Sequence, residues 1–319
     1  RNPAVAAISF DKSEDKPKRS IMKQVMFTLA VLLNAYMLSA CSINIGADRS
    51  AGHYERDAAD YGANDGVIER SLSVRPFTAL ECRLPASVTY VQTNDQAPKV
   101  VLKGAPAMVE RCVVDVRDGK LQLYLVQKAK QSMKRFSQSR NQLNITVYGG
   151  RLTALAVQSA CTFYAAQLET SQLALSNAGA SSIRVGRFAG QQLTMSCSGA
   201  SSTKLAGNVA KLMLNVTGAS SFVANEFATQ DLKAKVSGAS TAKCALQGSA
   251  GVDVSGASTL TLSGTADLFT IKCSGASSVK AADLKAQNVV VDVAGASGVK
   301  CYAACSIKGT VGCGSLNYG

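Results

Sequence analysis

The phrase Gly-Ala-Ser recurs seven times in the second half of the chain, and this repeat limits the fold more than any other feature. Successive glycines are 18 to 20 residues apart, at Gly179, Gly199, Gly218, Gly238, Gly256, Gly275 and Gly295. A fixed period of this length is typical of repeat proteins, in which each repeat supplies one structural unit.

Aligning the repeats on their glycines shows apolar residues at alternate positions before each glycine. The residues four before it are Leu175, Met195, Leu214, Ala234, Val252, Ile271 and Val291. The residues three before it are mostly polar: Ser176, Ser196, Asn215, Lys235, Asp253, Lys272 and Asp292. This alternation predicts a strand with one buried face. A second strand is expected after the glycine, because apolar or small residues lie four and six positions past it.

Two short strands and two bends in about 19 residues predict one rung of a β-solenoid, with rungs stacked in parallel at about 4.8 Å. Glycine gives the bend its φ freedom, and the serines of successive rungs form a column able to hydrogen-bond along the axis. A flexible linker rich in Gly, Ala and Ser is the alternative. It is disfavoured, because linkers lack in-phase columns of Leu, Val and Ile.

The repeated Ser-Gly-Ala-Ser-Ser phrase and the closing Gly314–Gly319 segment resemble the putative auto-transporter adhesin, head GIN domain family. The resemblance covers about Ser71 to Gly319. It implies an all-β fold, a right-handed single-stranded parallel β-helix, and a bacterial protein that is secreted or lipid-anchored. The handedness comes from the resemblance, since the repeat does not determine it.

The N-terminal part has the pattern of a bacterial lipoprotein signal. After Met22 and Lys23, an apolar run ends in Leu-Ser-Ala-Cys at Cys41, which resembles the lipobox in which the cysteine is acylated. We therefore expect residues 1–21 to be an upstream extension, 22–40 a signal peptide and 41–70 a lipid-anchored tether. Ser42 favours the outer membrane of the cell envelope, and whether the protein faces the periplasm or the cell surface is left open.

The domain is expected to span 71–319, with N-terminal rungs and a cap over 71–148 and the repeats over 149–319. Strands are predicted at Ala79–Leu84, Ser87–Gln92, Lys99–Lys103, Cys112–Val116, Leu121–Val126 and Leu143–Val147. Asp118-Gly119 is expected to form a hairpin or rung-to-rung turn. Val157–Cys161 is interpreted as a degenerate repeat. Lys128–Arg140 is basic and is either a solvated loop or an anion-contacting one.

The chain has ten cysteines, and Cys41 is assigned to the lipid. Cys197, Cys244, Cys273 and Cys301 occupy inward columns, where a thiol acts as a small apolar group. The chain has no C-x-x-C pair and only one histidine, His53 in the tether, so no metal site is predicted. Cys301, Cys305 and Cys313 are close enough in sequence to form disulfides, and no pairing is assigned.

No cofactor motif or catalytic residue is predicted. His53 lies outside the domain, and the chain has neither a phosphate-binding loop nor a dinucleotide fingerprint. Asp253 and Asp292 share an outward column at a spacing near that of inverting glycosidases. Because this column alternates as Lys235, Asp253, Lys272 and Asp292, a surface ion-pair ladder is the favoured interpretation.

The net charge is +13, and part of it falls in one outward column, five residues past each glycine. Its basic members are Arg184, Lys204, Lys243, Lys280 and Lys300. The column is either a solvated face that opposes aggregation or a contact surface for an acidic glycan or lipopolysaccharide, nucleic acid being disfavoured. The leading hypothesis is a non-enzymatic, lipid-anchored envelope scaffold that binds an anionic glycan or acts in adhesion. The alternative is a β-helical lyase or glycosidase, and the oligomeric state is left open.

Overall fold

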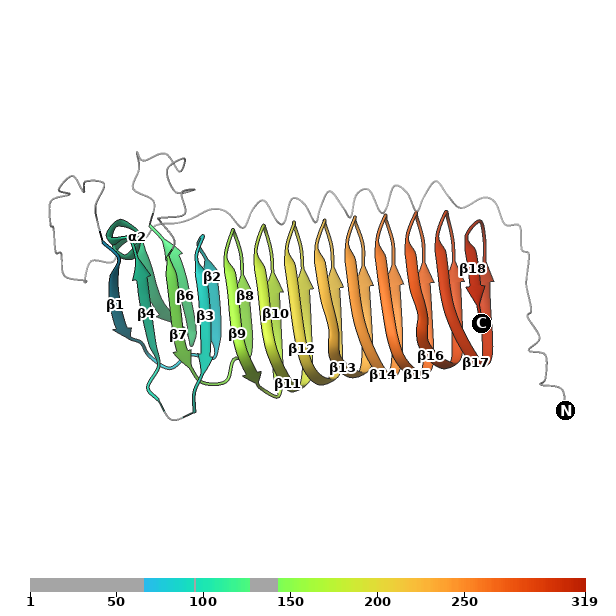
Figure 1. Ribbon diagram of the computed structural model, residues 1–319, viewed down its shortest axis with the longest axis horizontal. Helices are drawn as coiled ribbons and strands as arrows, with labels where there is room; N and C mark the ends of the chain where they lie inside the picture. Colours follow the sequence, from blue (N-terminus) through green and yellow to red (C-terminus); the bar gives the residue numbers. More distant parts are fainter. Residues whose placement is uncertain (1–65, 95, 127–142) are drawn as a thin grey trace. The chain divides into compact units, whose positions relative to one another are not determined.

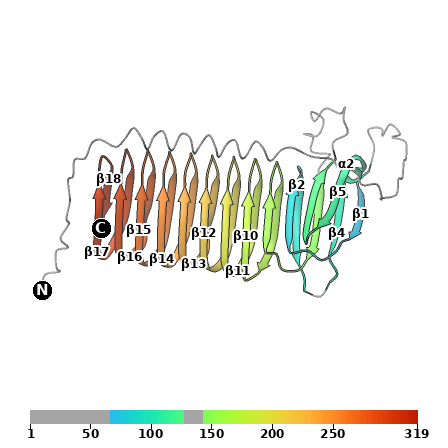
Figure 2. The ribbon, with the colours of Figure 1, turned by 180° about the vertical axis from the view of Figure 1, so that it is seen from behind.

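The computed structural model describes residues 66–94, 96–126 and 143–319, which form a single 18-stranded sheet wound into stacked rungs (Figure 1). Figure 2 shows the same stack from behind, with successive strands running in the same direction from β10 to β17. The predicted parallel β-helix is therefore confirmed. The predicted signal peptide, Cys41, the tether up to residue 65 with His53, and all of Lys128–Arg140 lie outside the described residues, whereas the last residues of the predicted tether belong to a strand that begins at Ile68.

The repeat region is built from β8 onward, and its rungs pair in parallel and in phase. The strands are β8 (Ala154–Val157), β9 (Thr162–Glu169), β10 (Gln172–Asn177), β11 (Ser182–Cys197), β12 (Ser202–Val216), β13 (Ser221–Val236), β14 (Thr241–Val254), β15 (Thr259–Cys273), β16 (Ser278–Val293), β17 (Gly298–Val311) and β18 (Ser315–Tyr318). Leu193, for example, lies opposite Leu173 on one side and Leu212 on the other. The aligned columns of the sequence are therefore physical columns of neighbouring side chains.

Each full rung differs from the prediction in one respect. Instead of two short strands separated by a bend, β11 to β17 are continuous strands of 14 to 16 residues that carry the bend within them. Backbone pairing resumes on both sides of the bend, with a register shift such as that between Val185 and Phe188. The ladder of hydrogen bonds thus extends through most of the rung.

The Gly-Ala-Ser turns require glycine for two reasons. The seven repeat glycines have φ between +69° and +83°, which is the left-handed region. A Cβ on Gly238 would also lie 2.5 Å from the carbonyl oxygen of Gly218 in the rung before. In the degenerate repeat, Ser159 takes the glycine position at φ 67°, which confirms that interpretation.

The serine column is buried and bonds along the axis, as expected. Ser240 donates to the Gly218 carbonyl at 3.2 Å, and Ser201 donates directly to Ser220 at 3.2 Å. Most of the column's axial bonds therefore join a hydroxyl to a backbone carbonyl of the previous rung, rather than one hydroxyl to the next.

The inward columns of the two halves of each rung pack against each other in a core one chain wide. Cys197, Cys244, Cys273 and Cys301 are all buried in it, as predicted. Asn177 is the polar exception among the residues two before each glycine, and its exposure is 0%. Its amide donates to the Ser202 carbonyl and to the Thr203 hydroxyl, both at 2.8 Å.

The N-terminal end departs from the parallel pattern. Its elements are β1 (Ile68–Ser73), β2 (Ala79–Arg83), β3 (Ser87–Gln92), β4 (Lys99–Gly104), α2 (Pro106–Arg111), β5 (Cys112–Arg117), β6 (Lys120–Leu125) and β7 (Asn144–Gly149). All six predicted strands are present, whereas β1 and α2 were not predicted. β4 pairs antiparallel with both β1 and β7, and β5 forms an antiparallel hairpin with β6 through Asp118-Gly119.

These antiparallel strands end the parallel stack, and α2 contacts β1, β4 and β5 (Figure 1). Met108 and Val109 of α2 are buried in the core. An exposed solenoid end presents unpaired backbone and apolar side chains, so this arrangement protects the core from water and from edge association.

Candidate polyanion-binding face

The five predicted cations lie in one continuous column on the outward surface of the first half of the rungs, which we call the basic face. Residues four and six past each turn glycine point inward, so the residue between them must point outward. Register pairs Arg184 with Lys204 and Lys280 with Lys300, while Lys243 lies between Val223 and Thr261. The structure therefore brings all five together in one column, over six rung spacings or about 29 Å.

All five cations are exposed, and none is neutralised by a neighbour. Among the described residues, the ion pairs within 4.0 Å are confined to the N-terminal region, and none includes a member of this column. A neighbouring outward column, three residues past the glycine, consists of Ser and Thr from Ser182 to Ser278. The face thus places hydroxyl groups beside unpaired positive charges, which suits contact with oxyanions.

The column extends toward the N-terminus into an aromatic residue that the sequence analysis did not single out. Tyr164 on β9 lies opposite Arg184 and next to Thr89 of β3, and 42% of its surface is exposed. Tyr164 is five residues past Ser159, so continuing the repeat phase back into the degenerate repeat would have revealed it.

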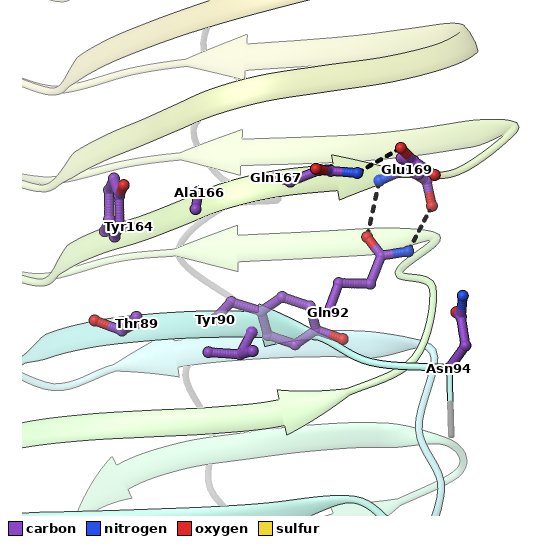
Figure 3. Close-up of a pocket in the computed structure, with 9 residues that line it drawn as sticks. Thr89, Tyr90, Gln92, Asn94, Tyr164, Ala166, Gln167 and Glu169 are labelled. Atoms are coloured by element: carbon purple, nitrogen blue, oxygen red, sulfur yellow. Dashed lines mark hydrogen bonds between the residues drawn. The ribbon is translucent and has the colours of Figure 1, made fainter. Parts of the chain in front are cut away.

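A hollow of about 290 Å³ lies beside Tyr164 (Figure 3). Gln92 joins its two walls: the side-chain amide donates to the Glu169 carbonyl at 2.9 Å and accepts from the Glu169 backbone N–H at 2.8 Å. Gln167 donates to the Glu169 carboxylate at 2.5 Å. These bonds hold the walls in place, while Tyr164 and Asn94 remain exposed to a ligand.

A second hollow of about 710 Å³ lies at the other end of the same face. Lys280 and Lys300 border it, and the small residues Ala282 and Gly298 leave room in it. Asp283 is its acidic member. The basic column therefore runs between two depressions, and only the C-terminal one is lined by cations of the column.

The alternating column of Lys235, Asp253, Lys272 and Asp292 is in register as expected, on the opposite half of the rungs. However, these four described residues form no ion pair within 4.0 Å, because long exposed side chains gain little from being fixed together. Asp292 instead accepts a hydrogen bond from the Thr310 hydroxyl at 3.1 Å. The ion-pair ladder is thus present as a charge pattern without direct contacts.

The cysteines of the described residues are free, including Cys301, Cys305 and Cys313, so the disulfides that the sequence left open are not formed. Cys301 is buried, whereas Cys305 and Cys313 are exposed. Burial raises the pKa of Cys244 to about 12 and that of Cys301 to about 11. Thiols held protonated in this way are poor nucleophiles.

Two further observations concern the described residues alone. They contain no cluster of three or more His, Cys, Asp or Glu side chains placed to hold a metal ion. The single helix among them is too short to cross a membrane.

The fold and the turn column together define a single-stranded parallel β-helix with in-phase Gly-Ala-Ser turns. The sequence matches the family described as putative auto-transporter adhesin, head GIN domain, over residues 76–259 and 247–318. The chain belongs to this family.

Solved structures show the same architecture. A putative adhesin from Bacteroides fragilis is 17% identical, with a TM-score of 0.53 over 79% of this chain and 97% of its own. A putative adhesin from Parabacteroides distasonis is 14% identical, with a TM-score of 0.53 over 80% of this chain and 98% of its own. At these identities the likeness concerns the fold alone. No curated protein matches the sequence.

Proposed function

We propose that this protein is a non-enzymatic scaffold of the bacterial cell envelope whose basic face binds an extended polyanion. The ligand class is an acidic glycan or the phosphorylated sugars of lipopolysaccharide. The observation that carries the proposal is the register-aligned column of five unpaired cations. Arg184 and Lys204, and likewise Lys280 and Lys300, lie in neighbouring rungs about 4.8 Å apart, where like charges repel, and an anionic ligand lying along the column would relieve that repulsion.

Family membership supports an adhesion-type role, since the family and two structural relatives are named as putative adhesins. An adhesive scaffold needs a rigid surface that repeats along its length, and the β-helix provides one. The hollow beside Tyr164 adds an aromatic surface at the end of the column, where a sugar ring could stack.

The binding test compares two variants of equal charge. Lys204, Lys243, Lys280 and Lys300 are changed to Gln in the test variant. Lys233, Lys235, Lys272 and Lys308, all exposed on the other half of the rungs, are changed to Gln in the control. Each variant lowers the net charge from +13 to +9.

Retention on a heparin column should fall for the test variant and stay close to wild type for the control. Salt should weaken retention of the wild type steeply, because each cationic contact releases counterions. Equal loss in both variants would show that net charge alone governs retention and would refute a specific basic face. Incubation with acidic and neutral glycans, followed by analysis of chain length, tests for cleavage, which would contradict a non-enzymatic role.

We further propose that Cys41 carries a lipid that anchors the protein to the outer membrane. The support is the Leu-Ser-Ala-Cys phrase after an apolar run. Wild-type protein expressed in a bacterium should fractionate with membranes and carry acyl groups on Cys41 by mass spectrometry. The Cys41→Ser variant should lose both properties. Soluble wild-type protein with an unmodified Cys41 would contradict the proposal.

A further inference from the structure

A groove of about 600 Å³ runs along the half of the rungs that does not carry the basic face. It crosses β11 to β15 between two outward columns, three and five residues before each turn glycine. Its length is four rung spacings, or about 19 Å. Ligand sites commonly have volumes of about 300–1,000 Å³, so this groove is large enough for a small molecule.

The groove exists because one of the two outward columns has a glycine, which lacks a side chain, near its middle. The column five residues before each turn glycine forms one wall of the groove and consists, in rung order, of Thr194, Met213, Lys233, Gly251 and Thr270. A Cβ on Gly251 would meet no atom within 4 Å, so the space above this glycine is open. Met213 is 46% exposed beside the opening.

The inner surface of the groove is predominantly apolar despite its charged residues. Met213 contributes its thioether side chain, and the lysines contribute their methylene stems while their ammonium groups extend into water. Surface of this kind favours an alkyl chain over a sugar. An acyl chain spans half of the 30 Å bilayer core, about 15 Å, which corresponds to about three rung spacings.

The charges around the groove favour an anion. Lys233 and Lys235 flank it from opposite walls of the same rung, and Lys272 lies two rungs further along. Asp253 is the acidic member of the lining. None of these four described groups forms an ion pair within 4.0 Å, so the lysines are available to a carboxylate.

We infer that this groove binds a single-chain anionic amphiphile, namely a free long-chain fatty acid. The carboxylate lies between Lys233 and Lys235, and the alkyl chain runs from this rung over Gly251 and Thr270 toward the exposed Val290 of the next rung. This site is on the other half of the rungs from the basic face and does not depend on polyanion binding.

Gly251→Met gives a direct test, because it fills the groove without straining the fold. Gly251 does not have a φ in the left-handed region, and a methionine there would lie beside Lys233 as Met213 does. Thr261→Met, which adds the same side chain to the basic face, is the control. Binding of dodecanoate below its micelle concentration would be measured by titration calorimetry on the full chain.

Wild type and Thr261→Met should bind dodecanoate saturably, with a Kd below about 1 mM. Gly251→Met should bind at least about tenfold more weakly with an unchanged melting temperature. A Lys233→Gln/Lys235→Gln variant should also lose about tenfold, because hydrogen bonds to charged groups exceed neutral ones in strength.

Four results would overturn the inference. The first is absence of dodecanoate binding by the wild type, and the second is equal binding by Gly251→Met. The third is equal affinity of the wild type for dodecyltrimethylammonium, which has the same chain length and the opposite charge. Binding to anionic vesicles without binding to monomeric dodecanoate would also count against it, since it would indicate a membrane-docking face.

Discussion

The buried amide of Asn177 offers a sharp test of how the narrow core handles a polar group. Its two N–H bonds are used by the Ser202 carbonyl and the Thr203 hydroxyl, each at 2.8 Å, and its oxygen accepts from Ser181 at 2.5 Å. Thr203→Val keeps the side-chain shape and removes one acceptor. Because Thr203 is 1% exposed, water is not positioned to replace that acceptor.

We expect Thr203→Val to lower the free energy of unfolding by about 1–3 kcal/mol, the cost of leaving a buried donor unpaired. For a domain of this size the melting temperature should fall by about 2–4 °C per kcal/mol. The double variant Asn177→Val/Thr203→Val should recover much of the loss. Replacing both partners with apolar groups is close to neutral, and valine occupies the same column at Val216 and Val236.

The assay is urea unfolding followed by far-ultraviolet circular dichroism, with all variants in one double-mutant cycle. Thr261→Val is the matched control, because Thr261 points outward and its substitution should change stability by less than about 0.5 kcal/mol. If Thr203→Val were as stable as wild type, or the double variant less stable than the single one, the amide would not be paired as described.

Other predictions follow from the turns, the core and the buried thiols. Gly238→Ala should cost several kcal/mol, because of its positive φ and the 2.5 Å approach to a carbonyl, while Gly251→Ala should be close to neutral in thermal melts. Val236→Lys should cost several kcal/mol by burying an unpaired ammonium, whereas Lys235→Glu should cost well under 1 kcal/mol. Burial raises the pKa of Cys244 from 9.0 to about 12, so between these pH values the thiol loses its proton in the unfolded chain but keeps it in the folded one. The contribution of Cys244 to the free energy of unfolding is therefore full below pH 9 and is lost between pH 9 and 12, at about 1.4 kcal/mol per pH unit. The Cys244→Ala variant should therefore lose less stability than wild type between pH 8 and 10.5 in urea unfolding.

The sequence predicted the repeat region well because each column repeats the same constraint seven times. Every rung must place small or apolar residues inward and a glycine at the left-handed turn. A departure from the pattern in one repeat, such as Asn177 in an apolar column, is therefore outweighed by the other six repeats. The same logic located the basic column, since the two inward positions on either side of Lys243 determine where it points.

The N-terminal region lacks this redundancy. The alternation in a single strand determines which side chains face the core, but it does not determine the partner strand or its direction. The six strands were therefore predicted, and a hairpin was one of the two alternatives for Asp118-Gly119, but the antiparallel pairing of β4 with β1 and β7 was not predicted. The six-residue helix α2 carries too little periodicity for detection, with Met108 and Val109 as its buried residues.

The basic face was predicted from the sequence and the groove over Gly251 was not, and both outcomes have the same physical reason. A charged column can be read from the sequence, because it depends on residue type at one position of the repeat. A hollow depends on a small residue standing next to large ones in neighbouring rungs, as Gly251 does between Lys233 and Thr270. Such a gap can be recognised in the sequence only by comparing the sizes of the residues that occupy one position of the repeat in successive rungs.

The outward columns are free to carry function because the inward ones and the turns hold the fold. A substitution at Lys243 or Gly251 changes a surface without touching the core, whereas one at Val236 or Gly238 disturbs a rung and both of its neighbours. The two halves of each rung also present separate surfaces, so a basic column and an apolar groove can coexist without competing for residues. It follows that loss of polyanion binding and loss of fatty-acid binding should be separable by substitutions that leave the melting temperature unchanged.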